Sequence, residues 1–235
     1  MRFVRFLLAG LLLTPALPAR ALDAVDAAPA DALASDLARA APDMSRQVIG
    51  LALQAMTCAT GGTASAARLA VIDYSRPSLQ PRLWVFDLKQ RTLLFHELVA
   101  HGRNSGDNFA SRFSNEEGSL ASSLGLFRTS DTYEGGNGYS LRLDGLDPGF
   151  NDRARERAIV MHGAPYVNSE IGHSLGRLGR SWGCPAVRSG VARLMIDDLK
   201  QGQFLFSYYP DPKWLAGSRL LNCDRAQTVA ANSRP

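Results

Sequence analysis

Short runs of β-forming residues separated by turn residues occupy most of the chain after residue 67, and they constrain its fold most strongly. Each run is bounded by Gly, Pro, Asn, Asp or Ser, which is typical of strands and their connections. The runs span residues 68–75, 82–88, 91–102, 124–135, 138–146, 157–164 and 204–209. The pattern predicts a mainly β domain, with a hairpin over residues 82–102.

Two segments have helical spacing instead. Residues 42–60 carry apolar side chains three and four positions apart, with Ser45 as a candidate N-cap and Gly61 as a stop. Residues 191–201 predict a second, short helix. Residues 22–44 are rich in Ala, Asp and Pro, and we expect them to be loosely ordered.

The first 21 residues are typical of an export signal. Arg2 and Arg5 precede an apolar run, Phe6 to Leu13, which is shorter than the roughly 20 residues needed to cross a bilayer. Small residues at Ala19 and Ala21 suit a signal peptidase. We therefore expect a signal peptide at 1–21, a periplasmic location, and no integral membrane segment in the mature chain.

The net charge indicates no nucleic-acid partner. The chain has 26 Lys and Arg against 22 Asp and Glu, but three of the arginines lie in the predicted signal. Without them the balance is 23 against 22, which leaves no basic footprint for nucleic acid. About 210 residues remain, enough for one domain with a substantial core.

Three cysteines give an odd count, which in an exported protein leaves one thiol over. Cys58 and Cys223 lie near the two ends of the mature chain. We expect a disulfide between Cys58 and Cys223, with three free thiols or another pairing as alternatives. Cys184 then remains free.

Cys184 lies in the stretch GRSWGCPAV, which favours an accessible thiol. Pro185 disfavours a helical conformation at Cys184, and Gly183 lets a substrate approach the backbone. The amides of Gly183 and Cys184 could then stabilise an oxyanion. These features suit a nucleophile in acyl transfer.

A nucleophilic cysteine needs a base, and the four histidines are the candidates. We favour His162, which ends a strand 22 residues before Cys184 and is followed by Gly163, a residue that leaves room beside the imidazole. His173 and His101 remain alternatives. His96 lies within a strand and is expected to be a half-buried structural residue.

Several separated motifs together resemble the L,D-transpeptidases of bacterial cell walls, which have a YkuD-type catalytic domain. The motifs are IVMHGAPYV and LGRSWGCPAV, with AHGRNSG and SSLGLF before them. Trp182 replaces a family histidine and Pro185 a family aliphatic residue, as in the divergent YkuD_2 or murein L,D-transpeptidase catalytic domain group. The resemblance covers roughly residues 45–210.

The resemblance implies a β-sandwich with mixed sheets, an N-terminal helix and one or two short helices. It also implies that Cys184 is the nucleophile, that His162 is the base, and that the Gly163 carbonyl orients His162. The substrate would be a peptidoglycan stem peptide. Cys184 would attack the carbonyl of the diamino acid at stem position three, expel D-Ala, and pass the acyl group from a thioester to an amine.

A stem peptide carries carboxylates, which arginines bind. We therefore expect substrate contacts from residues flanking Cys184 and from polar loops nearby. The candidates are Arg180, Ser181, Trp182, His173, Arg188, Tyr139 and Asn104. For Ser181, a hydrogen bond within the site is the expected role.

The division of the chain that follows is a signal peptide at 1–21, a loosely ordered segment at 22–44, a catalytic domain at 45–210 and a tail at 211–235. The chemistry requires no cofactor. One alternative is an L,D-carboxypeptidase, in which water takes the acyl group. Two further alternatives are a zinc protein using His162, His173 and Cys184, and a wall-binding module without activity.

Overall fold

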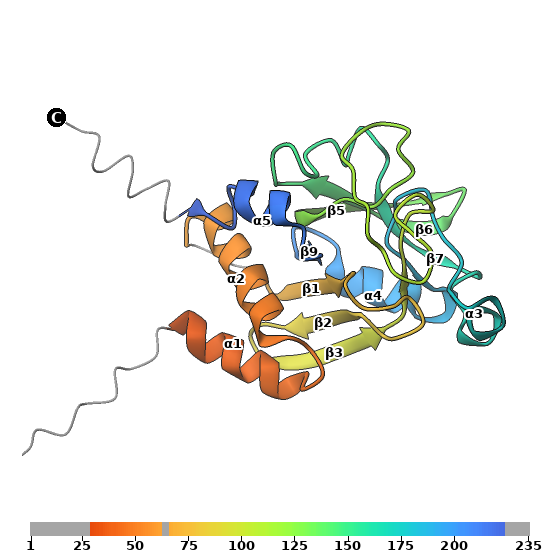
Figure 1. Cartoon of the computed structure of the whole chain (residues 1–235). Coiled ribbons are helices and arrows are strands. Elements are labelled where there is room, and N and C mark those ends of the chain that lie inside the picture. The colour runs from red at the N-terminus through yellow and green to blue at the C-terminus, as the bar shows by residue number, and fades with distance from the viewer. Residues whose placement is uncertain (1–28, 63–65, 224–235) are drawn as a thin grey trace, which may run out of the picture.

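The computed structural model describes residues 29–62 and 66–223, and it is mostly β, as predicted (Figure 1). Its helices are α1 (Pro29–Ala40), α2 (Arg46–Thr60), α3 (Ser169–Leu175), α4 (Ser189–Leu199) and α5 (Pro212–Gly217). Its strands are β1 (Arg68–Asp73), β2 (Leu83–Asp87), β3 (Thr92–Glu97), β4 (Val99–Ala100), β5 (Gly125–Gly135), β6 (Gly138–Gly145), β7 (Val160–Ala164), β8 (Ala186–Arg188) and β9 (Phe204–Tyr208).

All nine strands belong to one mixed sheet in the order β3-β2-β1-β9-β5-β6-β7-β8-β4. The pairs β1–β9 and β7–β8 are parallel, and the other pairs are antiparallel. The edge strands β3 and β4 are separated in the chain by Leu98 alone. Because neighbouring strands lie about 4.8 Å apart, the sheet must curl back on itself to bring its edges together. The described strands thus form one continuous, curled mixed sheet, and the predicted mainly β fold with mixed strands and short helices is confirmed.

Each face of the sheet carries a hydrophobic core. On β1, Leu69 and Val71 pack in the cluster that includes α1 and α2, whereas Ala70 and Ile72 pack in the cluster that includes α4. Side chains alternate between the two faces of a strand. Both faces are covered, so β1 is apolar at its four central positions, from Leu69 to Ile72.

The predicted helix over residues 42–60 is present as α2. Gly61 ends it in the left-handed conformation (φ 61°), and the Gly61 amide donates to the Cys58 carbonyl. Ser45 precedes the helix with an extended backbone, but its side chain makes no capping hydrogen bond. The prediction that Gly61 ends the helix is therefore confirmed. Ser45 occupies the N-cap position, but its side chain does not cap the helix.

The expectation of loose order is wrong for residues 29–40, which form α1. Leu37 is fully buried, and Leu33 and Ala41 pack in the same cluster at helical spacing. α1 lies against α2 and β3 (Figure 1). The Ala- and Asp-rich composition concealed an apolar stripe that gains its stability from contacts with α2.

The predicted tail also contains structure, because α5 packs on the same core. The Asp211 carboxylate caps it by accepting from the Trp214 amide (2.8 Å). Trp214 is buried, and its indole donates to the buried Asp147 (2.8 Å). The predicted signal peptide and the residues beyond Cys223 lie outside the described residues.

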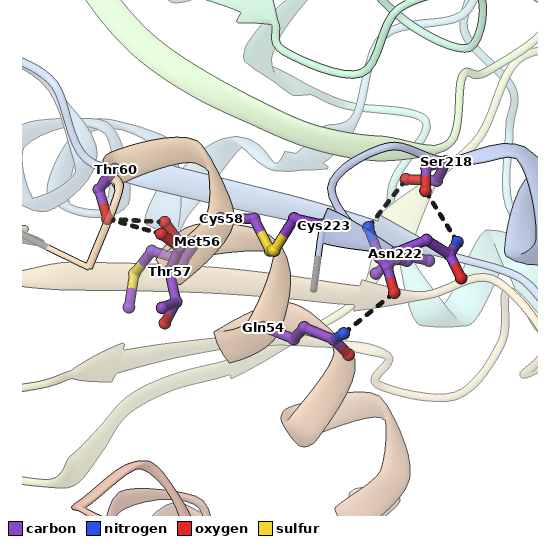
Figure 2. Close-up of a disulfide and its surroundings, with 9 residues drawn as sticks. Gln54, Met56, Thr57, Cys58, Thr60, Ser218, Asn222 and Cys223 are labelled. Carbon is purple, nitrogen blue, oxygen red and sulfur yellow. Dashed lines mark hydrogen bonds between the residues drawn. A yellow bond between two sulfur atoms is a disulfide. The ribbon is translucent and has the colours of Figure 1, made fainter. Parts of the chain in front are cut away.

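A disulfide joins Cys58, at the end of α2, to Cys223, the last described residue (Figure 2). This is the pairing that the sequence analysis favoured, and it leaves Cys184 as a free thiol. Two hydrogen bonds flank it: Gln54 donates to the Leu221 carbonyl (3.0 Å), and Asn222 donates to the Ser218 carbonyl (2.8 Å). The C-terminal segment is thus fastened to α2.

Replacing both Cys58 and Cys223 by serine is expected to lower the free energy of unfolding by about 2–5 kcal/mol. The two cysteines are 165 residues apart, so the bond restricts a long stretch of the unfolded chain. Urea unfolding with and without a reductant checks this. Equal midpoints for the oxidised wild type and the double variant would contradict it.

No helix in the described ranges 29–62 and 66–223 is long and apolar enough to cross a membrane.

Candidate active site

The parallel pairing of β7 and β8 brings the two candidate catalytic residues to one place. In this register His162 is paired with Ala186, two residues after Cys184. Cys184 and His162 line the same cavity of about 440 Å³. Its other lining residues are Tyr133, Asn137, Arg157, Ala158, Val160, Tyr166, Arg180, Ser181 and Trp182.

Cys184 lines this cavity and, as a residue, is 9% exposed. Its Sγ accepts from the Val160 amide (3.4 Å) and donates to the Ala158 carbonyl (3.8 Å). Burial raises the pKa of the thiol, and the Val160 amide and the Arg157 guanidinium partly offset this rise. The thiol is therefore protonated at neutral pH and needs a base.

The His162 ring is oriented by its own strand. Nδ1 lies 3.0 Å from the Gly163 carbonyl oxygen, the contact that the resemblance implied for Gly163. A carbonyl can only accept, so Nδ1 carries the proton and Nε2 keeps a lone pair. Burial lowers the pKa of His162, which keeps the ring neutral. Among the described residues, no hydrogen bond joins this ring to the Cys184 thiol in the resting state.

Ser181 shapes the turn that carries Cys184. Its hydroxyl donates to the Cys184 carbonyl (2.6 Å) and accepts from the Gly183 amide (3.1 Å). In this conformation the Gly183 amide, which was expected to be an oxyanion donor, is already bonded to the Ser181 hydroxyl. The amides beside the sulfur are those of Val160 and of Cys184 itself.

Glycine is required at 183 and 163 for packing reasons. Gly183 has a φ of +125°, and a Cβ there would lie 2.8 Å from the Ala121 carbonyl oxygen. A Cβ on Gly163 would lie 2.8 Å from the Cβ of Ala192 on α4. Gly163 thus allows α4 to approach β7, instead of leaving room beside the imidazole.

His101 is a structural residue beneath the site. Arg82 Nη2 lies 2.7 Å from His101 Nδ1, and His101 Nε2 faces the Gly106 carbonyl (3.2 Å). Burial and the Arg82 charge lower the pKa of His101 to about 4. The His101 carbonyl accepts from the Ser181 amide (3.0 Å), so this segment supports the Cys184 turn.

Four predicted substrate contacts lie elsewhere than in the cavity lining. The exposed His173 is on α3, with Nδ1 against the Ser169 carbonyl. Arg188 pairs with Glu97 (2.6 Å), and the Tyr139 hydroxyl donates to Asp197 (2.8 Å). Asn104 donates to the Ser119 carbonyl. Each of these four residues is bonded to a residue outside the cavity lining. Three other predicted contacts, Arg180, Ser181 and Trp182, do line the cavity.

Four residues that line the cavity were not predicted from the sequence: Arg157, Tyr133, Tyr166 and Asn137. Arg157 begins the run RAIVMHGA, which was interpreted only as a strand. Its distance of five residues from His162 was the one available signal. Tyr133 and Asn137 come from the β5–β6 hairpin, whose approach to β7 no local pattern encodes.

No group of three His, Cys, Asp or Glu side chains in the described part of the chain could hold a metal ion. The three zinc ligands considered from sequence are not assembled, because His173 lies on α3 and is not part of the cavity.

The match to protein families covers most of the folded region. The L,D-transpeptidase catalytic domain matches residues 40–208, more than half of the chain. The chain belongs to the L,D-transpeptidase family. The resemblance drawn from the sequence motifs is thereby confirmed. A comparison with curated proteins gives no match.

Solved L,D-transpeptidase structures are distant from this family member. The enzyme from Mycobacterium smegmatis has 13% identity and a TM-score of 0.39, with 61% of this chain and 59% of that chain covered. An enzyme from Mycobacterium tuberculosis H37Rv has 13% identity and a TM-score of 0.36, with 61% and 58% covered. One from Stackebrandtia nassauensis has 12% identity and a TM-score of 0.36, with 78% and 92% covered. The chain spans about three fifths of the length of the two mycobacterial proteins.

Proposed function

We propose that this L,D-transpeptidase family member is an acyltransferase of peptidoglycan, with Cys184 as nucleophile and His162 as base. The observation that carries the proposal is a free thiol that lines the same cavity as a neutral, oriented imidazole. The cavity volume of about 440 Å³ is in the range that holds a small ligand.

In the first step, the Cys184 sulfur attacks the carbonyl of the diamino acid at stem position three. His162 Nε2 takes the thiol proton, and the same proton then goes to the departing amine of D-Ala. The bond between the acyl carbon and that amine breaks, and a thioester remains on Cys184. This step requires the sulfur to turn from the Ala158 carbonyl toward His162.

In the second step, an amine attacks the thioester. The amine loses a proton to His162, the carbon–sulfur bond breaks, and Cys184 recovers its proton. The acceptor is a side-chain amine at position three, an N-terminal L-Ala amine or a free D-amino acid. Such chemistry is two-step, with a covalent intermediate.

Arg180 is the residue best suited to bind a carboxylate of the stem peptide. Its Nη1 donates to the carbonyls of Arg103 and Gly106 and to Asp107. Among the described residues, its Nε and Nη2 have no hydrogen-bond partner, and they form the edge that binds a carboxylate in two places. Trp182, 73% exposed, offers an apolar wall at the same cavity.

We place the mature protein in the periplasm. The signal-like features of residues 1–21 support this location. The Cys58–Cys223 disulfide also supports it, because such bonds persist in oxidising compartments.

Incubation with purified muropeptides tests the proposal. Cross-linked dimers or D-amino acid exchange products, detected by mass spectrometry, are expected. Protein whose Cys184 has been alkylated beforehand is the control. Tripeptide without any transfer product would instead indicate the carboxypeptidase, and unchanged muropeptides would contradict an enzyme of either kind.

The acid limb of the pH profile is expected below pH 6.5. Protonated His162 cannot accept the thiol proton, and burial lowers the pKa of His162 below the usual imidazole value. Activity is therefore kept as the pH falls through 6.5 and is lost only on passing the lower pKa. The measurement is kcat/KM for muropeptides against pH. An acid limb at or above 6.5 would contradict this assignment.

A further inference from the structure

Arg157 lies where three segments of the active site meet: the start of β7, the segment 114–123 and the turn that carries Cys184. It lies just before β7, is half-buried, and lines the cavity with Cys184. Its Nη1 donates to the Ser114 carbonyl and the Ser123 hydroxyl. Its Nη2 donates to the Ser119 hydroxyl (3.1 Å) and the Ala121 carbonyl (2.7 Å).

These four contacts hold the segment 114–123 against the Cys184 turn. The Ala121 carbonyl oxygen is the atom that a Cβ on Gly183 would meet at 2.8 Å. The Ser122 hydroxyl donates to the Gly183 carbonyl (3.1 Å). Arg157 therefore fixes the backbone on which Gly183 and Cys184 rest.

The same contacts leave Arg157 unsuited to hold a substrate carboxylate by its Nη groups. A guanidinium has four Nη hydrogens, and the four acceptors named above use them all. The positive charge nevertheless lies in the lining of the cavity that also holds Cys184, and it favours the Cys184 thiolate. A charge held by four hydrogen bonds needs no rearrangement when the sulfur becomes negative.

Other charged groups around the cavity do not replace Arg157. Arg180, like Arg157, is a cation in the lining, but its Nη1 pairs with Asp107 (3.0 Å). Tyr166 stays neutral, since burial and the Cys184 charge raise its pKa to about 12. The remaining ionisable lining residues are Tyr133 and His162, and no lining residue is a carboxylate. Glu116, outside the lining, pairs with Arg153 (3.2 Å).

We propose that Arg157 is a positioning residue for the reaction at Cys184, which fastens the 114–123 segment under Gly183 and stabilises the sulfur as it becomes negative. The first role is mechanical and the second is electrostatic. The inference uses the proposed function only in naming that reaction, since thiolate stabilisation acts on any electrophile that reaches Cys184.

Two variants separate the roles. Arg157→Gln removes the positive charge, and its amide can still donate some of the hydrogen bonds to the 114–123 segment. Arg157→Lys keeps the charge but loses the planar guanidinium that makes all four hydrogen bonds. The readout is the rate at which iodoacetamide alkylates Cys184 against pH, with the disulfide intact so that Cys184 is the free thiol. Arg155→Gln is the matched control, because Arg155 is an exposed neighbour paired with Asp144.

For Arg157→Gln we expect the pH at which the alkylation rate is half-maximal to rise by about one unit. The alkylation rate near pH 7 should then fall roughly tenfold. Arg157→Lys should keep the midpoint and lose turnover of muropeptides, and Arg155→Gln should match the wild type in both. Circular dichroism verifies that each variant is folded.

Both Arg157 variants lose the planar guanidinium group. Equal alkylation midpoints for Arg157→Gln and Arg157→Lys would therefore overturn the electrostatic role. Wild-type turnover of muropeptides by Arg157→Lys would overturn the mechanical role. Alkylation needs no peptidoglycan, so failure of the proposed function would appear separately, as wild-type protein with a normal midpoint and no muropeptide product.

Discussion

Cys184→Ala is expected to abolish the reaction with muropeptides, by about a thousandfold or more. In the proposed mechanism the thiol forms the thioester, and alanine offers no substitute nucleophile. A thousandfold loss corresponds to about 4 kcal/mol of transition-state stabilisation. Product formation by mass spectrometry measures the loss, and the intact mass of the wild type caught during turnover should show an acyl adduct that the variant lacks.

The fold of the Cys184→Ala variant should survive. The hydrogen bonds of the sulfur with the Val160 amide (3.4 Å) and the Ala158 carbonyl (3.8 Å) are long and weak. Thermal unfolding within a few degrees of the wild type is the control. A folded Cys184→Ala variant that still formed transfer products would remove Cys184 from the mechanism, as would an acyl adduct on another residue.

His162→Ala should slow the reaction by roughly 10²- to 10⁴-fold, the usual contribution of a general base. The thiol is protonated at neutral pH because burial raises its pKa, so it depends on a nearby acceptor for its proton. Among the histidines, His162 is the one that lines the cavity with Cys184. The measurements are kcat with muropeptides and the rate of Cys184 alkylation near neutral pH, both of which should fall.

His173→Ala is the matched control for His162→Ala. His173 was an alternative base in the sequence analysis, but it is exposed on α3 and is not part of the cavity lining. Its removal should change kcat less than twofold. If His173→Ala lost as much activity as His162→Ala, or if His162→Ala kept wild-type kcat, the assignment of the base would be wrong.

Short-range patterns predicted most of the fold. The β-rich runs became strands because alternation and turn residues act locally. α1 was missed, because its apolar stripe is stable only against α2. The closing of one sheet through Leu98 was also beyond the reach of local patterns, since it depends on how nine strands pair.

The candidate nucleophile and base were identified from the sequence alone. Cys184 and His162 have distinctive neighbours, a Gly-Cys-Pro turn and a strand that ends in His-Gly, and these neighbours are contiguous in the chain. Of the residues predicted to contact substrate, four lie outside the cavity lining. Arg188 was chosen because it is near Cys184 in sequence, but it points to Glu97.

The sequence by itself thus determined which residues are the candidates for acyl-transfer chemistry, because local conformation follows from the immediate neighbours of a residue. Only the tertiary structure decided which side chains surround the thiol. Arg157, Tyr133 and Tyr166 reach the cavity through strand pairing and through hydrogen bonds to the 114–123 segment. Those contacts join residues tens of positions apart, and their free energy exists only once the sheet has assembled.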